Sequence, residues 1–347
     1  MNFAEKSERR GRIFFRGLGL TVLAFLLFLV AGFFWATATP GNSYSGPITP
    51  PDDAELPARL EGHVRSLSAT PRNLERATTV LATLTYLAQA LEEWGYEAER
   101  QDVLAPAENL IVTIPANTDD APILIIGAHY DTVPGSPGAD DNASGVAALL
   151  ELARSFQSLR GQSPIEVQMV FYANEEPPYF KTRAMGSYTH AQSIADPDRV
   201  IGMISLETMG YFSDEEGSQN YPFPLSIRYP QTGNFIAFVG DTSSRSFLRD
   251  TIEEFRRHAR IPSLGGTVPS LVQGVDWSDH WGYSQRGIPA FMVTDTAPFR
   301  NPHYHRQTDT PETLDYDRLT LVVEGLDKAL REKLFDSTKN AVTLTPL

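Results

Sequence analysis

Short apolar runs alternate with stretches of helical spacing along most of the chain. The runs at 123–126, 165–173 and 200–206 predict strands buried in a sheet, and the segment 143–159 predicts an amphipathic helix. Strands that alternate with helices in this way predict a layered α/β fold with a largely parallel sheet. Further strands are predicted, the first of them at a sheet edge, at 96–103, 110–114, 235–239 and 290–293.

Helical spacing also recurs outside this central part, at 56–67, 73–94, 243–260 and 315–335. The segment 73–94 carries an apolar stripe that we expect to pack in the core, made of Leu74, Val80, Leu81, Leu84, Leu87 and Leu91. Gly95 is suited to end this helix, because glycine adopts the left-handed conformation freely. The segment 211–233 carries many aromatic and proline residues without a period, and we expect a functional flap or irregular excursion there.

The first apolar run differs from the others because Gly17–Ala36 continues for 20 residues without a charge. With a rise of about 1.5 Å per residue, a helix of this length spans a hydrocarbon core of about 30 Å. Residues 1–16 carry the flanking basic side chains, which predicts a cytoplasmic tail and places the rest of the chain on the other side of the membrane. Residues 37–55 are rich in Pro, Gly and Ser and predict a linker to a domain at 56–340.

A cleavable signal peptide is the alternative to this membrane anchor. The tripeptide Ala36-Thr37-Ala38 resembles the small-x-small pattern of a cleavage site. The apolar run is nevertheless longer than the hydrophobic region of a usual signal, which is about 7–15 residues. The uncleaved anchor is therefore favoured, and an exported, cleaved protein remains the second possibility.

Composition narrows the chemistry of this 347-residue chain. A formal net charge of -14 argues against nucleic acid as a partner, because like charges repel. The chain has 0 cysteines, which excludes disulfides, thiolate metal ligands and a cysteine nucleophile. No GxSxG elbow and no P-loop occur, so serine-hydrolase and nucleotide-binding functions lack support.

Imidazole and carboxylate side chains follow four of the predicted strands. His129 and Asp131 end the first, Glu175 and Glu176 follow the second, and Glu207 follows the third. Asp140 and Asp141 close the loop after the first strand, and His303 and His305 come after the strand at 290–293. Ligands of α/β sheets bind at the carboxyl ends of the strands, and imidazole with carboxylate oxygen is a typical zinc ligand set. A cation also explains how several carboxylates could lie together, because they would otherwise repel one another.

The adjacent pair Glu175-Glu176 needs a bend in the chain to serve one site. Neighbouring side chains of an extended strand point to opposite faces, but a bend at the strand end can bring both to one point. One carboxylate could then bind metal while the other accepts a proton from water. Metal-assisted hydrolysis requires that division of work.

Five motifs in this order resemble metallopeptidase family 28: GAHYDTVPGSPGADDNASG, NEE, SLETMGY, SDH and NPHYHRQTDTPETLDY. The family comprises di-zinc aminopeptidases, glutamate carboxypeptidase-like enzymes and glutaminyl cyclases. The resemblance covers about 56–335, and its motifs together are far more specific than any one alone. It implies a three-layer α/β sandwich with a mixed, largely parallel central sheet of the zinc exopeptidase type.

The resemblance also implies roles for individual residues. Two zinc ions per chain would share Asp141, one held also by His129 and Glu207 and the other by Glu176 and His305. Glu175 matches the general base, and Asp131 would orient the His129 ring. Asp140 matches a position at which the family tends to have a strained peptide bond. His305 is preferred over His303 because its spacing to Asp309-Thr310 fits the family.

The sequence departs from the family pattern in two places. Glu207 stands where many members have a shorter aspartate ligand, and Pro177–Lys181 intervene before the Gly186-Ser187 step. The second departure should border the substrate cleft, so specificity cannot be transferred from other members. Asp279, in the SDH motif, is expected to bind substrate or order the site.

The function that these inferences favour is a zinc-dependent exopeptidase that hydrolyses peptides through a zinc-activated water, most simply an aminopeptidase. A carboxypeptidase would need a basic pocket, for which Arg300 is the nearest candidate. A glutaminyl cyclase would typically use one zinc, and a receptor-like ectodomain would be expected to have lost ligands. The substrate, the native metal and the oligomeric state do not follow from the sequence.

Overall fold

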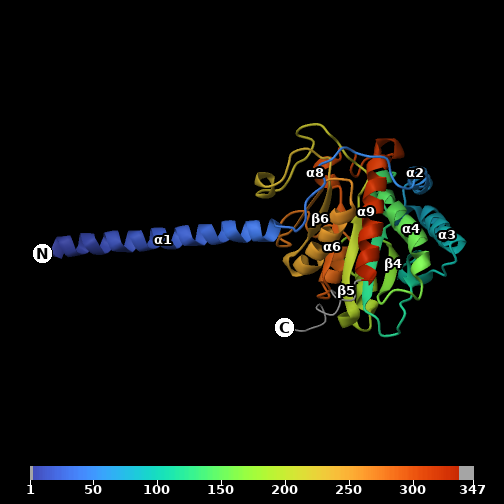
Figure 1. Cartoon of the computed structure of the whole chain (residues 1–347), viewed down its shortest axis with the longest axis horizontal. Helices are drawn as coiled ribbons and strands as arrows, with labels where there is room; N and C mark the ends of the chain where they lie inside the picture. The colour runs from blue at the N-terminus through green and yellow to red at the C-terminus, as the bar shows by residue number, and fades with distance from the viewer. Residues whose placement is uncertain (1–2, 336–347) are drawn as a thin grey trace. The chain divides into compact units, whose positions relative to one another are not determined.

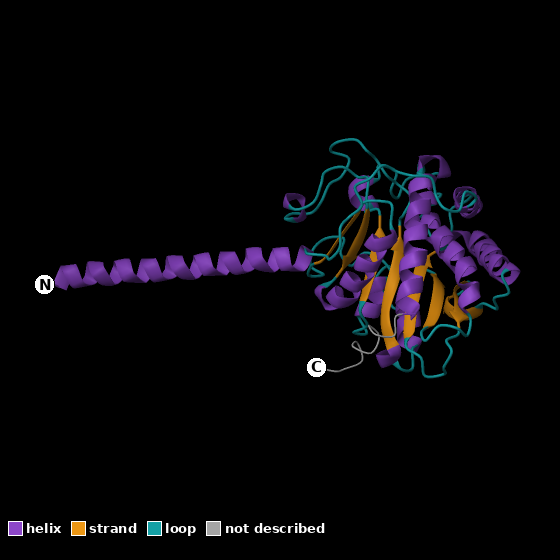
Figure 2. Ribbon diagram, viewed as in Figure 1, coloured by secondary structure: helices purple, strands orange, loops and turns teal. Residues whose placement is uncertain are grey.

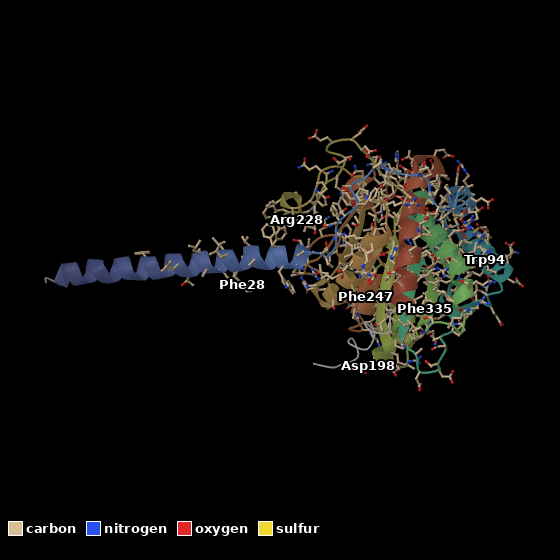
Figure 3. The ribbon with its side chains drawn as sticks, in the orientation of Figure 1. Phe28, Trp94, Asp198, Arg228, Phe247 and Phe335 are labelled. Atoms are coloured by element: carbon tan, nitrogen blue, oxygen red, sulfur yellow. The ribbon has the colours of Figure 1, made fainter. Side chains whose placement is uncertain are left out.

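The computed structural model describes residues 3–335, which divide into two compact units between Ala38 and Thr39 of the sequence. The first unit contains helix α1 (Phe3–Thr37). Its segment Gly17–Thr37 is long and apolar enough to cross a membrane, and a signal sequence near an N-terminus would have the same character. Apolar side chains of this helix are exposed, as Phe28 illustrates in Figure 3.

The second unit is built on one mixed sheet of eight strands in the order β1-β2-β4-β3-β5-β8-β6-β7 (Figures 1 and 2). The strands are β1 (Glu99–Leu104), β2 (Ala107–Ile114), β3 (Ile123–His129), β4 (Glu166–Tyr172), β5 (Val200–Glu207), β6 (Ile236–Gly240), β7 (Ser263–Thr267) and β8 (Ala290–Thr294). The central strands β4, β3, β5 and β8 run parallel, whereas β1, β2 and the β8–β6 pair are antiparallel. The prediction of a mixed, largely parallel sheet is therefore confirmed.

Helices cover both faces of this sheet, which makes three layers. The helices of this unit are α2 (Leu56–Leu67), α3 (Ala77–Glu93), α4 (Gly145–Phe156), α5 (Gly186–Ser193), α6 (Arg245–His258), α7 (His280–Ser284), α8 (Ala297–Arg300) and α9 (Tyr316–Phe335). Side chains of β3 alternate between two cores. Leu124 and Ile126 pack with α4, α6 and α9, and Ile123 and Ile125 pack on the face that carries α5 and α7. A strand buried on both faces needs a continuous apolar run, as the sequence has here.

Three details differ from the sequence-based expectations. The helix predicted at 143–159 is more deeply buried than a surface-facing amphipathic helix would be, because every residue from Gly145 to Ala153 of α4 is buried. Leu81 of the predicted stripe is 48% exposed, whereas Leu84 and Leu87 are buried. The strand β7 and the helices α7 and α8 were not predicted, because each is short and carries few periodic apolar residues.

Residues 39–53 of the segment expected to be a linker lie against helices of the second unit. Arg256 of α6 donates hydrogen bonds to Thr39 Oγ1 (3.0 Å) and to the carbonyl of Pro40 (2.6 Å). Further along, the backbone amides of Asp52 and Asp53 donate to Glu324 of α9. Proline and glycine thus shape an extended segment that side chains of two helices hold in place.

The predicted excursion at 211–233 is irregular and forms a hairpin-like flap. Its base is closed by a bond from the amide of Ser213 to the carbonyl of Gly233 (2.9 Å) and another from Gln219 to Gln231 (3.0 Å). Its tip contains one short turn of helix at Leu225–Ile227, which lies next to Arg228 in Figure 3. We call residues 211–233 the flap below.

Candidate metal centre

The first group of candidate ligands lies at the carboxyl ends of β3 and β5. His129 is the last residue of β3, Glu207 is the last residue of β5, and both are buried. The His129 Nε2 atom lies 3.3 Å from a carboxylate oxygen of Asp141 and 3.3 Å from one of Glu207. Because β3 and β5 are parallel neighbours, their ends meet at one edge of the sheet and bring these side chains together.

The second group uses the other oxygen of the same aspartate. His305 Nε2 lies 3.1 Å from Asp141 Oδ2 and 3.3 Å from Glu176 Oε2. In each group the three candidate ligand atoms lie within 4.8 Å of one another. The structure thus places Asp141 between two sets of candidate ligand atoms, with one carboxylate oxygen facing each set.

Asp131 connects these groups to the Glu175-Glu176 pair. The chain bends just after β4, where Asn174 has a positive φ of 58°, a conformation that asparagine tolerates better than most residues. The two amides that follow the bend donate to Asp131, Glu175 at 2.9 Å and Glu176 at 3.1 Å. The Oδ1 atom of Asp131 also lies 3.5 Å from His129 Nδ1. One carboxylate therefore positions both the imidazole and the bend that carries the Glu pair.

Asp309 supports the other side of the site in the same manner, a role that the sequence did not reveal. It accepts hydrogen bonds from the amides of Asp140 (2.9 Å) and Asp141 (3.2 Å). Gly138 precedes this pair with a φ of 64°, and a Cβ there would lie 2.3 Å from the carbonyl oxygen of Asp141. Only glycine fits this approach, which accounts for its place in the loop.

Arg72 was also missed, although it holds the loop between His129 and Asp141. Its side chain is 1% exposed, and its guanidinium donates to the carbonyls of Tyr130 (2.7 Å), Pro137 (2.7 Å) and Gly138 (2.9 Å). Burial lowers the pKa of Arg72 to about 10. A single arginine outside any motif gives no signal in a sequence, so only the structure could identify it.

The remaining contacts of the ligand side chains fix their orientation. The Ser278 hydroxyl donates to Glu207 Oε2 at 2.7 Å. The ring of Tyr304 stacks on that of His305, with centroids 3.8 Å apart and planes 18° from parallel. The longer side chain of Glu207 thus reaches the same point as the other ligands and is held there by the SDH motif.

One expectation about the backbone needs correction. The peptide expected to be unusual lies one residue later than predicted, because the cis bond joins Asp141 to Asn142. Asp140 itself accepts hydrogen bonds from Asn301 Nδ2 (2.7 Å) and from the amide of Gly210 (2.9 Å). It therefore ties the loop to the segment that carries His305.

Burial and mutual repulsion dominate the electrostatics of the site. Burial and the nearby Asp141 raise the pKa of Glu176 to about 8, and burial raises the pKa of Glu175 well above its usual range. Burial alone would lower the pKa of His305, but Asp141 and Glu176 raise it to about 10. The side chains alone would thus hold protons that a bound cation would displace.

A second observation indicates that the two groups of candidate ligands can hold metal ions. The Nε2 atom of His129 and the Oε1 atom of Glu176 are buried without a hydrogen-bond partner. Buried polar atoms normally have partners, and unpartnered ones call for an explanation such as an ion. Divalent cations bound between neutral imidazoles and carboxylates would supply one.

Other candidates from the sequence lie outside the two groups. His303 Nδ1 is 2.9 Å from Thr308 Oγ1, away from Asp141. Asp279 is completely buried, and burial raises its pKa to about 8.

Among the described residues, Glu254, His258 and Glu332 form one further cluster of possible metal ligands. Arg257 lies 2.6 Å from Glu254 and supplies a positive charge there.

Arg300 does not offer a basic pocket. Its Nε donates to Gln219 Oε1 at 2.7 Å and its Nη1 to the carbonyl of Phe235 at 2.9 Å. The side chain is 7% exposed and ties the base of the flap to β6. Arg300 was the nearest candidate to bind the carboxylate of a substrate. In the structure it stabilises the base of the flap instead.

Comparisons with known proteins agree with this geometry. Residues 109–328 match peptidase family M28. The uncharacterized protein YfbL of Escherichia coli K12 is 40% identical over 286 residues, which cover 78% of this chain and 86% of that protein. Leucine aminopeptidase 1 of Arthroderma otae is 26% identical over 224 residues, which are 61% of this chain and 54% of that protein. The chain thus spans about half the length of this second relative.

Among solved structures, LapB from Legionella pneumophila has a TM-score of 0.63 at 21% identity, with 85% of this chain and 79% of that chain covered. This likeness concerns the fold. The family match extends from β2 into α9 and includes every candidate ligand. The chain belongs to peptidase family M28.

Proposed function

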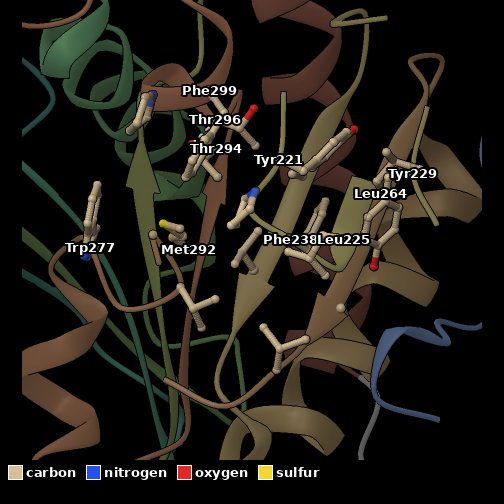
Figure 4. Close-up of a pocket in the computed structure, with 18 of the residues that line it drawn as sticks. Tyr221, Leu225, Tyr229, Phe238, Leu264, Trp277, Met292, Thr294, Thr296 and Phe299 are labelled. Carbon is tan, nitrogen blue, oxygen red and sulfur yellow. Dashed lines mark hydrogen bonds between the residues drawn. The ribbon is translucent and has the colours of Figure 1, made fainter. Parts of the chain in front are cut away.

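We propose that this protein is a zinc-dependent aminopeptidase. The observation that carries the proposal is the pair of ligand groups that share Asp141, with the buried Glu175 beside them, in a member of a peptidase family. The relative named as a leucine aminopeptidase supports the choice among exopeptidases. Among the described residues, no lysine, arginine or histidine lines the apolar pocket beside Glu207 and Tyr304 (Figure 4), which disfavours a carboxypeptidase.

His129, Asp141 and Glu207 would hold one zinc ion, and Asp141, Glu176 and His305 the other. When bound, such ions polarise a peptide carbonyl and lower the pKa of a water molecule. Glu175 would accept the proton of the attacking water and pass it to the leaving amine. Asp131 contacts both the His129 ring and the backbone amide of Glu175. These contacts fix the position of the proposed base relative to the proposed ligand His129.

The test is a panel of fluorogenic peptides with free and with blocked N-termini, assayed with and without a chelator. An aminopeptidase should cleave only the unblocked peptides, lose this activity with chelator and regain it with zinc. Cleavage of blocked peptides with a free C-terminus would contradict the proposal. Elemental analysis should give two zinc ions per chain, whereas one would favour the cyclase alternative.

We further propose that α1 anchors the protein in a membrane with the N-terminus in the cytoplasm. The apolar segment Gly17–Thr37 and the basic residues before it support this orientation. Protease treatment of intact cells and of opened cells distinguishes the two orientations. Release of the catalytic unit as a soluble protein would instead identify a cleaved signal.

A further inference from the structure

The tip of the flap, residues 221–230, presents apolar side chains on two sides. Tyr221, Leu225 and Tyr229 line the apolar pocket beside the candidate metal centre (Figure 4). Phe223 and Ile227 alternate with them along the chain, are not among the described residues that line the pocket, and are 80% and 73% exposed. Scattered apolar residues are normal on a protein surface, so the place of this pair in the molecule decides what it indicates.

Arg228 is the one charged residue between 221 and 230. It is exposed and lies at the tip of the flap in Figure 3. We call Phe223, Ile227 and Arg228 the outer face of the tip. Large apolar side chains beside an arginine are typical of segments that lie at the surface of a bilayer. In such segments the apolar side chains reach the acyl chains, and the long arginine side chain keeps its charge among the headgroups.

The first residues of the second unit are held against the edge strand β7 and its neighbour α6. Arg256 of α6 donates to Thr39 Oγ1, as described above. The amide of Ser263, the first residue of β7, donates to Ser43 Oγ at 2.8 Å. A Cβ at the position of Gly265 would lie 3.3 Å from Thr39 Cγ2. Thr39 therefore packs on β7 at Gly265.

The flap tip is joined to the same glycine. The Tyr229 hydroxyl donates to the carbonyl of Gly265 at 2.8 Å, so Gly265 contacts both the tip and Thr39. Thr39 follows the last residue of the apolar segment, Thr37, by two positions. Two residues of chain span at most about 7 Å, and one headgroup layer of a bilayer is about 5–8 Å thick. A membrane that holds α1 therefore has its headgroups near Thr39, next to the strand that binds the flap tip.

Resting on the membrane anchor proposed above, we propose that the outer face of the flap tip enters the headgroup layer of the membrane that holds α1. The partner of this face is a lipid bilayer, and Phe223 and Ile227 reach the edge of its acyl chains. The formal net charge of -14 disfavours electrostatic attraction to the membrane as the main force, so the contact depends on apolar burial. Since the other side of the tip lines the pocket, the membrane holds one wall of the pocket in place.

The experiment uses the full chain, in which any introduced cysteine is the only site for a thiol-reactive fluorophore. Ile227→Cys is labelled and reconstituted into phosphatidylcholine vesicles that contain a lipid with a nitroxide quencher on its acyl chain. The matched control is Leu104→Cys, because Leu104 is 41% exposed on β1, at the opposite edge of the sheet from β7. Neighbouring strands lie about 4.8 Å apart, so eight strands keep the two edges well separated. We expect quenching of the label at 227 and none at 104.

A third label, at Leu26→Cys in α1, distinguishes failure of this inference from failure of the anchor. Quenching at 26 together with no quenching at 227 would overturn the inference and leave the anchor intact. No quenching at either position would overturn both proposals. Quenching at 227 without quenching at 26 would support the contact of the tip and contradict the anchor.

A last variant tests whether apolar burial drives the contact. A label at Ser226→Cys reports on the tip while Phe223 and Ile227 are both replaced by serine. Loss of two apolar side chains should shift the balance between inserted and withdrawn tip by about tenfold or more, seen as weaker quenching. Because both residues are exposed, the unfolding midpoint should not change. Undiminished quenching would overturn the inference.

Discussion

The metal centre and the apolar pocket meet at Glu207 but are built in opposite ways. His129 and Glu207 end buried central strands, and Asp131 and Asp309 each accept two backbone amides and so hold the loops that carry Glu176 and Asp141. The pocket is instead walled by the flap, by the edge strand β7 and by side chains with no charge except that of Glu207. The comparison teaches that the candidate metal ligands and the apolar pocket occupy separate parts of the sheet.

The largest effect should come from the base itself. Glu175→Gln keeps the size of the side chain but cannot accept a proton, so we expect turnover to fall by about 100- to 10,000-fold. Metal content should stay at the wild-type level, because the ligands are unchanged. Steady-state kinetics with elemental analysis measure both. Turnover within a few-fold of the wild type would refute the role of Glu175.

A smaller effect is expected from the residue that positions the ligands. Asp131→Asn replaces one acceptor oxygen by a donor that faces a backbone amide, and loss of such a partner typically lowers metal affinity about 10- to 100-fold. Competition with a chromophoric chelator measures the affinity. Asp102→Asn, on the exposed edge strand β1, is a matched control that should leave the affinity unchanged. Equal affinities for both variants would mean that Asp131 has no part in metal binding.

The smallest effect should arise on the pocket side. Arg300→Lys cannot keep the bonds to Gln219, Phe235 and Tyr211, so the flap base should loosen. We expect the free energy of unfolding to fall by about 1.5–3 kcal/mol and KM to rise more than kcat falls. Denaturant unfolding and kinetics check this. A drop in metal content instead would show that the two regions are less separate than the structure indicates.

Sequence reasoning located the central part of the molecule well for physical reasons. Buried strands such as β3 need uninterrupted apolar runs, and these runs ended within a few residues of His129 and Glu207. The structure brings all five side chains of the proposed ligand set into the two groups around Asp141. That they bind zinc remains a proposal for the experiments above.

The supporting residues and the pocket could not be predicted. Arg72 and Asp309 act through backbone atoms far away in sequence, and such contacts leave no periodic pattern. Leu81 fits the helical stripe but lies on the exposed side of α3, because helical spacing alone does not fix the width of the buried face. The flap has no period at all, and tertiary bonds from Gln219 and Tyr229 determine its path.

The position of β7 has a consequence for the history of this protein. An edge strand has one neighbouring strand only, here β6, so β7 touches none of the strands that end at His129 and Glu207. Related proteins could therefore differ in the wall of the apolar pocket, through substitutions at the edge of the sheet. The candidate metal ligands at the centre of the sheet would stay the same.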